Sequence, residues 1–336
     1  MLPKILAFSL VLFTLSCRFV AGTSASTHAS AEQPWSWQKI ADFGGPPTRG
    51  AHVFTADGAA YVVSGAGDDS VPHHQVWKYD PAANAWIRKN DYPGTAIIEG
   101  VAFSIGEAGY VGLGSTNGHG DPTTELWHYS AQADRWMRRA SFPGSARSGL
   151  VALVIGAKAY VVGGASGKPL RDVWEFDPQS NRWTRKADFP GAGRFMPAGF
   201  VIGTRGYLGL GSPGVGAFAR DFWEYDPLDD RWARKRDFPG APRAYAIGLS
   251  LGSRGYVGVG MVGFDRFSGA LNLTREVWEY DPAADTWARK RDFAGQSRSM
   301  AVGFALGSDI YFGLGNDAAI RNLKDFRRAG VSVAGQ

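Results

Sequence analysis

Four arginines recur at one position of a repeated segment, and together they have the chemistry of an anion site. Each stands three residues after a glycine that ends one copy of the segment: Arg147, Arg194, Arg243 and Arg298. In the first copy the arginine, Arg49, stands one place later; the second copy has Ile97 at the position, followed by Glu99. A guanidinium group grips carboxylate or phosphate through paired hydrogen bonds, and several in one funnel concentrate anions.

The segment that must position these residues repeats along most of the chain. Its second tryptophan falls at Trp37, Trp86, Trp136, Trp183, Trp232 and Trp287. Its first tryptophan, nine residues earlier, falls at Trp77, Trp127, Trp174, Trp223 and Trp278. A period of about 50 residues indicates the blades of a β-propeller. The 45 glycines and the many aromatic residues favour short strands joined by tight turns.

Each repeat reads as four antiparallel strands. A tyrosine marks the second strand, and a glycine follows it four residues later. The tyrosines are Tyr61, Tyr110, Tyr160, Tyr207, Tyr256 and Tyr311. The third and fourth strands form a hairpin across Asp226-Pro227 and its equivalents. A symmetric hairpin predicts that Trp223 faces Trp232 and that Glu224 faces Arg231.

The two ends of the repeat array complement each other. Residues 35–45 match a fourth strand without the first three, and residues 296–328 match the first three without the fourth. We therefore predict an all-β, six-bladed propeller over residues 35–336, whose last blade is closed by N- and C-terminal strands. Closure removes the open sheet edges that promote aggregation. In that blade Arg327 stands where tryptophan is expected, which predicts looser packing.

The tyrosine-glycine strand followed by W-x-Y-D-P and W-x-R-K resembles kelch repeats, over residues 35 to about 328. Only Gly163-Gly164 keeps the double glycine that is usual in that family, so the resemblance is to a divergent, bacterial exported type. It implies the propeller fold, and it offers a structural alternative for the arginines, which in kelch repeats can bond loop carbonyls. Kelch folds host many functions, so the resemblance alone assigns none.

In such a blade the loop that enters the first strand and the loop between the second and third strands emerge on one face. The predicted ligand site is therefore a ring at the mouth of the central channel: Arg49, Glu99, Arg147, Arg194, Arg243 and Arg298. The second set of loops would add His73, His74, Asn117, His119 and Asp121, and an insertion would add Phe264, Asp265, Arg266 and Phe267. No metal is predicted, because His119 and Asp121 lack a third ligand at a recognisable spacing.

The first 31 residues read as an export signal. Lys4 precedes an apolar run, and Ala29-Ser30-Ala31 is a candidate cleavage site. Cys17 follows the apolar run directly, so the alternative is a lipoprotein leader cleaved before Cys17, with membrane attachment only through a lipid there. Either interpretation predicts an exported protein that is periplasmic, secreted or at the cell surface.

Composition excludes several functions. The net charge is only +5, and the Arg-Lys pairs are spread along outer edge strands, so no nucleic-acid partner is expected. Cys17 is the only cysteine. A mature chain without it cannot perform the copper-radical chemistry of galactose oxidase, whose cofactor needs a cysteine linked to tyrosine. No cofactor is expected.

Three functions stay open. The favoured one is a non-catalytic module that binds a glycan, peptide or protein, including anionic ones, at the arginine ring. The second is an enzyme on acidic sugars, because some bacterial periplasmic kelch propellers epimerise the anomeric centre of sialic acid. That reaction needs an acid/base group and a carboxylate anchor, which Glu99 and the arginines supply. The third is a structural scaffold at the surface without a site.

Overall fold

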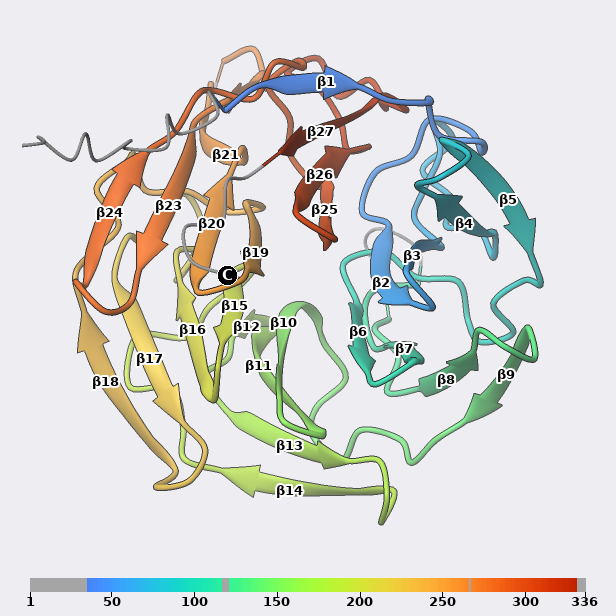
Figure 1. The fold of residues 1–336 in the computed structure, drawn as a ribbon. Coiled ribbons are helices and arrows are strands. Elements are labelled where there is room, and N and C mark those ends of the chain that lie inside the picture. The colour runs from blue at the N-terminus through green and yellow to red at the C-terminus, as the bar shows by residue number, and fades with distance from the viewer. Residues whose placement is uncertain (1–34, 117–120, 266, 331–336) are drawn as a thin grey trace, which may run out of the picture. The chain divides into compact units, whose positions relative to one another are not determined.

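The computed structural model describes residues 35–116, 121–265 and 267–330. The predicted leader with Cys17, and the loop residues Asn117, His119 and Arg266, lie outside the described residues. Within the described ranges the regular structure consists of β-strands (Figure 1). These ranges contain no helix with the length and apolar character that crossing a bilayer requires.

Six antiparallel sheets of four main strands form the blades. Blade 1 comprises β2 (His52–Ala56), β3 (Ala59–Val63), β4 (Val76–Asp80) and β5 (Ala85–Lys89). Blade 2 comprises β6 (Val101–Ile105), β7 (Ala108–Gly112), β8 (Leu126–Ser130) and β9 (Arg135–Arg138). Blade 3 comprises β10 (Ser148–Ile155), β11 (Lys158–Ser166), β13 (Val173–Asp177) and β14 (Arg182–Lys186), with the short β12 (Lys168–Pro169) beside β11.

The remaining three blades repeat the pattern. Blade 4 comprises β15 (Ala198–Ile202), β16 (Arg205–Gly209), β17 (Phe222–Asp226) and β18 (Arg231–Lys235). Blade 5 comprises β19 (Ile247–Leu251), β20 (Arg254–Gly258), β23 (Val277–Asp281) and β24 (Thr286–Arg289). Its insertion forms a separate hairpin of β21 (Met261–Phe264) and β22 (Leu271–Leu273). Blade 6 comprises β25 (Val302–Leu306), β26 (Asp309–Gly313), β27 (Phe326–Gly330) and β1 (Trp37–Lys39).

The innermost strands form a closed ring. Each contacts the next in the order β2, β6, β10, β15, β19 and β25, and β25 contacts β2 again. Figure 1 shows these strands around the centre, with β5, β9, β14, β18, β24 and β1 on the outside. The predicted six-bladed, all-β architecture is confirmed.

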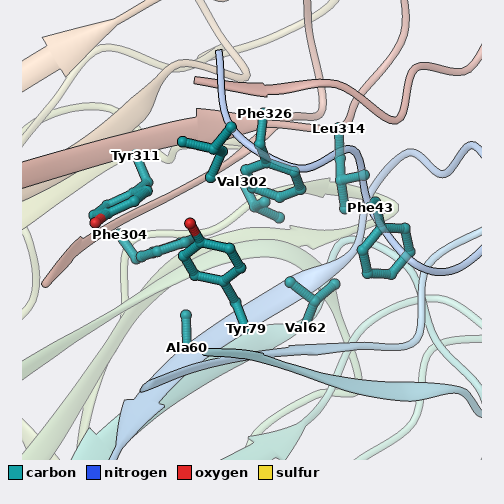
Figure 2. Close-up of a cluster of buried hydrophobic side chains, with 10 residues drawn as sticks. Phe43, Ala60, Val62, Tyr79, Val302, Phe304, Tyr311, Leu314 and Phe326 are labelled. Atoms are coloured by element: carbon teal, nitrogen blue, oxygen red, sulfur yellow. The ribbon is translucent and has the colours of Figure 1, made fainter. Parts of the chain in front are cut away.

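The closing blade joins the two ends of the described chain. β1 pairs with β27 in antiparallel register, Trp37 opposite Ala329 and Lys39 opposite Arg327. Blade 6 packs on blade 1 through a buried cluster that includes Phe304, Tyr311 and Tyr79 (Figure 2). Comparable clusters lie between the other blades, so closure uses the same aromatic packing as the rest of the ring.

The predicted hairpin register is wrong by one residue per strand. Trp223 faces Arg234, Tyr225 faces Trp232, and Asp226 faces Arg231. The turn therefore contains four residues, and its last one, Asp230, adopts a left-handed conformation with φ of 52°. Asp and Asn tolerate this conformation better than most residues, and that preference lengthens the turn.

This turn aspartate also ties one blade to the next. The Tyr225 hydroxyl donates a hydrogen bond of 2.6 Å to the Asp230 carboxylate, which accepts another of 3.0 Å from the backbone N–H of Ala187 in the preceding connection. Asn84, Asp134 and Asp285 make the corresponding pairs of bonds in other blades. The Asp or Asn of the turn thus fixes both the hairpin and the spacing of neighbouring blades.

We predict that Asp230→Ala lowers the free energy of unfolding by about 2 kcal/mol or more, because it leaves two donors without their acceptor. Asp229→Ala is the matched control, since Asp229 is the exposed neighbour in the same turn. Chemical denaturation of both variants measures the difference. Equal stabilities would contradict the tethering role.

Candidate functional site

Six residues at one position of the repeat surround the mouth of the central channel. All lie five residues after the glycine that ends the preceding repeat, and all have positive φ: Gly50, Glu99, Gly149, Met196, Tyr245 and Met300. Backbone hydrogen bonds link four of the six neighbouring pairs, including Gly50 N–H to Met300 O at 2.9 Å and Gly149 N–H to Glu99 O at 2.7 Å. We call these six residues the mouth ring.

The side chains of the mouth ring break the symmetry of the propeller. Gly50 and Gly149 leave room that larger neighbours fill: the side chain of Met300 lies over Gly50 and that of Phe195 over Gly149. Phe195 also packs edge to face on Tyr245, with ring centroids 5.9 Å apart. The mouth ring thus contains one carboxyl group, one phenol and two thioether side chains. At its two glycines only the backbone is present.

The side chains of Glu99 and Tyr245 form a hydrogen bond across the mouth of the channel. They belong to blades 2 and 5, which stand opposite each other in the ring of six. The Tyr245 hydroxyl donates to the Glu99 carboxyl group, which also accepts a bond of 3.1 Å from Ser148 Oγ. Burial raises the pKa of Glu99, against the opposing effects of these two hydrogen bonds and of the Arg49 charge. Burial beside Glu99 likewise raises the pKa of Tyr245.

Arg49 is the arginine that remains at the mouth. Its guanidinium group donates to Ser70 Oγ at 2.8 Å and to Asn322 Oδ1 at 3.3 Å, both neutral acceptors. No Asp or Glu of the described residues forms an ion pair with it. The Arg49 charge acts on the Glu99 carboxyl group, but no carboxylate of the described residues bonds this half-buried guanidinium group directly, which suits an anion anchor.

A pocket of about 310 Å³ opens between Arg49 and Tyr245. Blade 6 contributes Ser299, Met300, Asn316 and Ile320, and the blade 5 hairpin contributes Met261, Phe264 and Leu271. The hairpin is docked on blade 6, where the Leu271 N–H donates to Ala318 O at 3.3 Å. The insertion thus forms a wall of this mouth pocket, and the predicted overhang of the channel takes the form of a hairpin.

A second cavity of about 240 Å³ runs along the axis between the six innermost strands. His52 is its buried titratable group. Its Nδ1 donates to Val63 O at 3.3 Å, and its Nε2 accepts from the Gly100 N–H at 2.7 Å. Burial lowers the pKa of His52 to about 4, so this histidine is neutral and structural near neutral pH.

The other four predicted arginines lie inside the blades. Arg147, Arg194, Arg243 and Arg298 are almost fully buried. Their carboxylate partners, which directly precede the third strand of the same blade, are Asp172, Asp221, Glu276 and Asp325. Each guanidinium also stacks on a phenylalanine from the preceding connection: Phe142, Phe189, Phe238 and Phe293.

This placement differs from the expected ring of five arginines at the mouth. The arginines at the third position after the glycine turn into the blade, whereas Arg49, one residue later, faces the mouth pocket. Arg243 also donates to the Ala241 and Val259 carbonyls, which matches the structural alternative drawn from kelch repeats. Ligand contact by the four buried arginines stays a prediction.

The remaining candidates have local partners. His74 bonds the Tyr92 carbonyl at 2.8 Å, and His73 Nε2 lies 3.3 Å from Thr48 Oγ1. Asp265 caps its own turn by accepting bonds from the Phe267 and Ser268 N–H groups. No group of three or more His, Cys, Asp or Glu in the described ranges is arranged to hold a metal.

Tyr245 is not among the site residues predicted from the sequence. The repeats contain a signal for it. When they are aligned on their final glycine, Tyr245 and Glu99 fall at the same position, which varies between repeats although the neighbouring positions are similar. The link between them depends on blades that lie 146 residues apart in the chain, from residue 99 to residue 245. Only the closed ring brings these side chains together.

The fold and this site define a six-bladed β-propeller with an asymmetric pocket at one mouth. Residues 146–190 match the family model of the Kelch motif. Together with the fold, this match describes a six-bladed β-propeller that contains a Kelch motif. It is similar to a solved structure titled "Structure of YjhT", with a TM-score of 0.71, 15% identity, and coverage of 85% of this chain and 96% of that one. That likeness shows the fold alone.

A short local similarity links the chain to a curated enzyme. It is 41% identical over 58 residues to the N-acetylneuraminate epimerase of Yersinia enterocolitica serotype O:8 / biotype 1B (strain NCTC 13174 / 8081). The match covers 16% of this chain and 15% of that enzyme's length.

We predict that Arg243→Ala costs about 3–5 kcal/mol of stability, because it leaves the Glu276 carboxylate without its buried partner. Arg236→Ala, an exposed arginine near the same connection, is the control and should be nearly neutral. Thermal and urea unfolding measure both. An Arg243→Ala protein as stable as wild type would show that the ion pair is not structural.

Proposed function

We propose that the protein binds a small acidic sugar in the mouth pocket, with Arg49 as the anchor of its carboxylate. The observation that carries the proposal is the guanidinium group of Arg49, bonded only to neutral groups beside the pocket. A carboxylate in the pocket would give this cation the ion pair that its four relatives obtain from Asp or Glu inside the blades.

The chemistry of the walls suits a sugar with an apolar substituent. Phe264, Leu271 and Ile320 line the pocket with apolar side chains, whereas Ser299, Asn316 and Tyr245 contribute polar ones. The volume of about 310 Å³ lies at the lower end of the range for small-ligand pockets, so it suits a monosaccharide better than a folded partner. An N-acyl sugar acid combines the required carboxylate, hydroxyls and methyl group.

The second candidate function is catalysis of anomer exchange on that sugar. Glu99 favours it, because burial raises the pKa of this carboxyl group, which is hydrogen-bonded to Tyr245 in the pocket wall. The protonated carboxyl group would give its proton to the ring oxygen while the anomeric hydroxyl loses a proton to water. The ring C–O bond then breaks to the open-chain ketone, and closure on the other face returns both protons.

The short similarity to an N-acetylneuraminate epimerase supports this second candidate and suggests the probe to use. An exported protein, as predicted from residues 1–31, would meet such sugars outside the cytoplasm. Binding and catalysis would use the same site, so a variant of Arg49 tests binding and a variant of Glu99 tests catalysis.

The prediction for binding concerns Arg49. Arg49→Ala should weaken N-acetylneuraminate binding about tenfold or more, the loss expected for a charge-assisted pair, without lowering the melting temperature by more than a few degrees. Arg220→Ala removes an exposed arginine from the blade 4 loop and is the matched control. Isothermal titration calorimetry measures both affinities. Unchanged affinity in the Arg49 variant would remove the anchor from the proposal.

The prediction for Glu99 is a pH dependence. Because its pKa is raised, Glu99 is protonated at low pH and becomes ionised as the pH rises through that value. Ionised Glu99 repels the ligand carboxylate, so affinity should fall over this interval, and Glu99→Gln should abolish the fall.

The same variant separates the two candidate functions. If Glu99 is the acid, Glu99→Gln keeps binding but loses accelerated anomer exchange in an NMR exchange measurement, whereas Asp229→Asn, an exposed control, keeps both. Exchange at the uncatalysed rate with wild-type protein would leave a binding module. A Glu99→Gln protein that exchanges anomers as fast as wild type would exclude Glu99 as the acid.

A further inference from the structure

Blade 6 departs from the other five at one cross-strand pair on the outer side of the propeller. In the other blades the third-strand tryptophan stands opposite an arginine of the outer strand. These pairs are Trp77 with Arg88, Trp127 with Arg138, Trp174 with Arg185, Trp223 with Arg234, and Trp278 with Arg289. In three of them the guanidinium lies over the indole, 5.2–5.7 Å from the ring centroid. The tryptophan thus packs against the outer strand and forms a cation–π contact with the arginine.

In blade 6 both members of the pair are cations. Arg327 takes the tryptophan position, and Lys39 of β1 faces it. Like charges directly opposite each other on antiparallel strands are destabilising. The Nε of Arg327 is buried and has no hydrogen-bond partner among the described residues, and the nearest carboxylate oxygen, Asp325 Oδ2, is 3.9 Å away.

A hollow of about 620 Å³ is lined by both members of this pair, Arg327 and Lys39. We call it the rim pocket. Four cations line it: Lys39, Arg275, Lys324 and Arg327. Its two carboxylates are already engaged, since Asp42 pairs with Lys39 at 3.1 Å and Asp325 pairs with the buried Arg298 at 2.8 Å. The pocket therefore carries a net positive charge together with a guanidinium N–H that lacks an acceptor.

We infer that the rim pocket is a second anion site, which binds a phosphate or sulfate oxyanion between Arg327 and Lys39. A tetrahedral oxyanion supplies an acceptor for the Nε of Arg327 and places a negative charge between Arg327 and the facing lysine, so it relieves the repulsion of this pair. Because Lys39 lies on β1 and Arg327 on β27, the bound anion would hold together the two strands that close the ring. The inference does not depend on the acidic-sugar function of the mouth pocket.

The oxyanion can be free or part of a larger ligand. An adjoining hollow of about 440 Å³ shares Arg275 and Gln296 with the rim pocket, so a ligand longer than one anion has room to continue. Inorganic phosphate therefore tests the free form and dextran sulfate tests the polymer-borne form.

The test uses a variant that places tryptophan at position 327, as in the other repeats. Arg327→Trp should raise the melting temperature without ligand, because the indole replaces a cation opposite Lys39 with an aromatic ring, as tryptophan stands opposite arginine in the other blades. Wild type should gain thermal stability from phosphate or dextran sulfate beyond the effect of sodium chloride at equal ionic strength, and Arg327→Trp should lose this gain. Lys39→Gln, which changes an exposed side chain, should weaken oxyanion binding about tenfold or more if Arg327→Trp fails to fold.

Two controls separate this site from the rest of the molecule. Arg182→Gln removes an exposed cation from the outer strand of blade 3 and should keep the wild-type response. Arg49→Ala should also keep it, which places the response outside the mouth pocket. A response to dextran sulfate alone assigns the polymer-borne form. No anion-specific response in wild type, or an equal response in Arg327→Trp and Lys39→Gln, would overturn the inference.

Discussion

Closure of the ring is the constraint on which the rest of the structure depends. β1 must pair with β27 so that six sheets share one axis, and only then do the innermost strands meet in sequence. The tyrosine and turn-aspartate tethers set the spacing between blades, and the buried aromatic clusters fill the wedge between them. The mouth ring exists because this geometry brings six equivalent loop positions together.

The same repeat position serves structure in one copy and chemistry in another. Arg147, Arg194, Arg243 and Arg298 neutralise carboxylates within the blades, where an unpaired charge would be costly. Blade 1 has Thr48 at that position and its arginine one residue later, which moves the cation from the interior to the mouth pocket. A shift of one residue is thus enough to convert a structural cation into a candidate anchor.

The sequence predicted the strands, the six blades and the closing blade, because tryptophan spacing and strand alternation are local signals. It also singled out Arg49 and Glu99. It misplaced the third-to-fourth hairpin by one residue, because the left-handed Asp230 lengthens the turn. It placed the buried arginines at the mouth, because loop position alone does not tell which way a side chain turns. Tyr245 depended on a contact between opposite blades, which no local pattern encodes.

The most direct measurement is a crystal structure of the protein with N-acetylneuraminate bound. We expect the sugar carboxylate to lie within about 3 Å of the Arg49 guanidinium group, with the remainder of the ligand between Tyr245 and the β21–β22 hairpin. A sugar bound elsewhere on the propeller, or a mouth pocket that stays empty at saturating ligand, would contradict it.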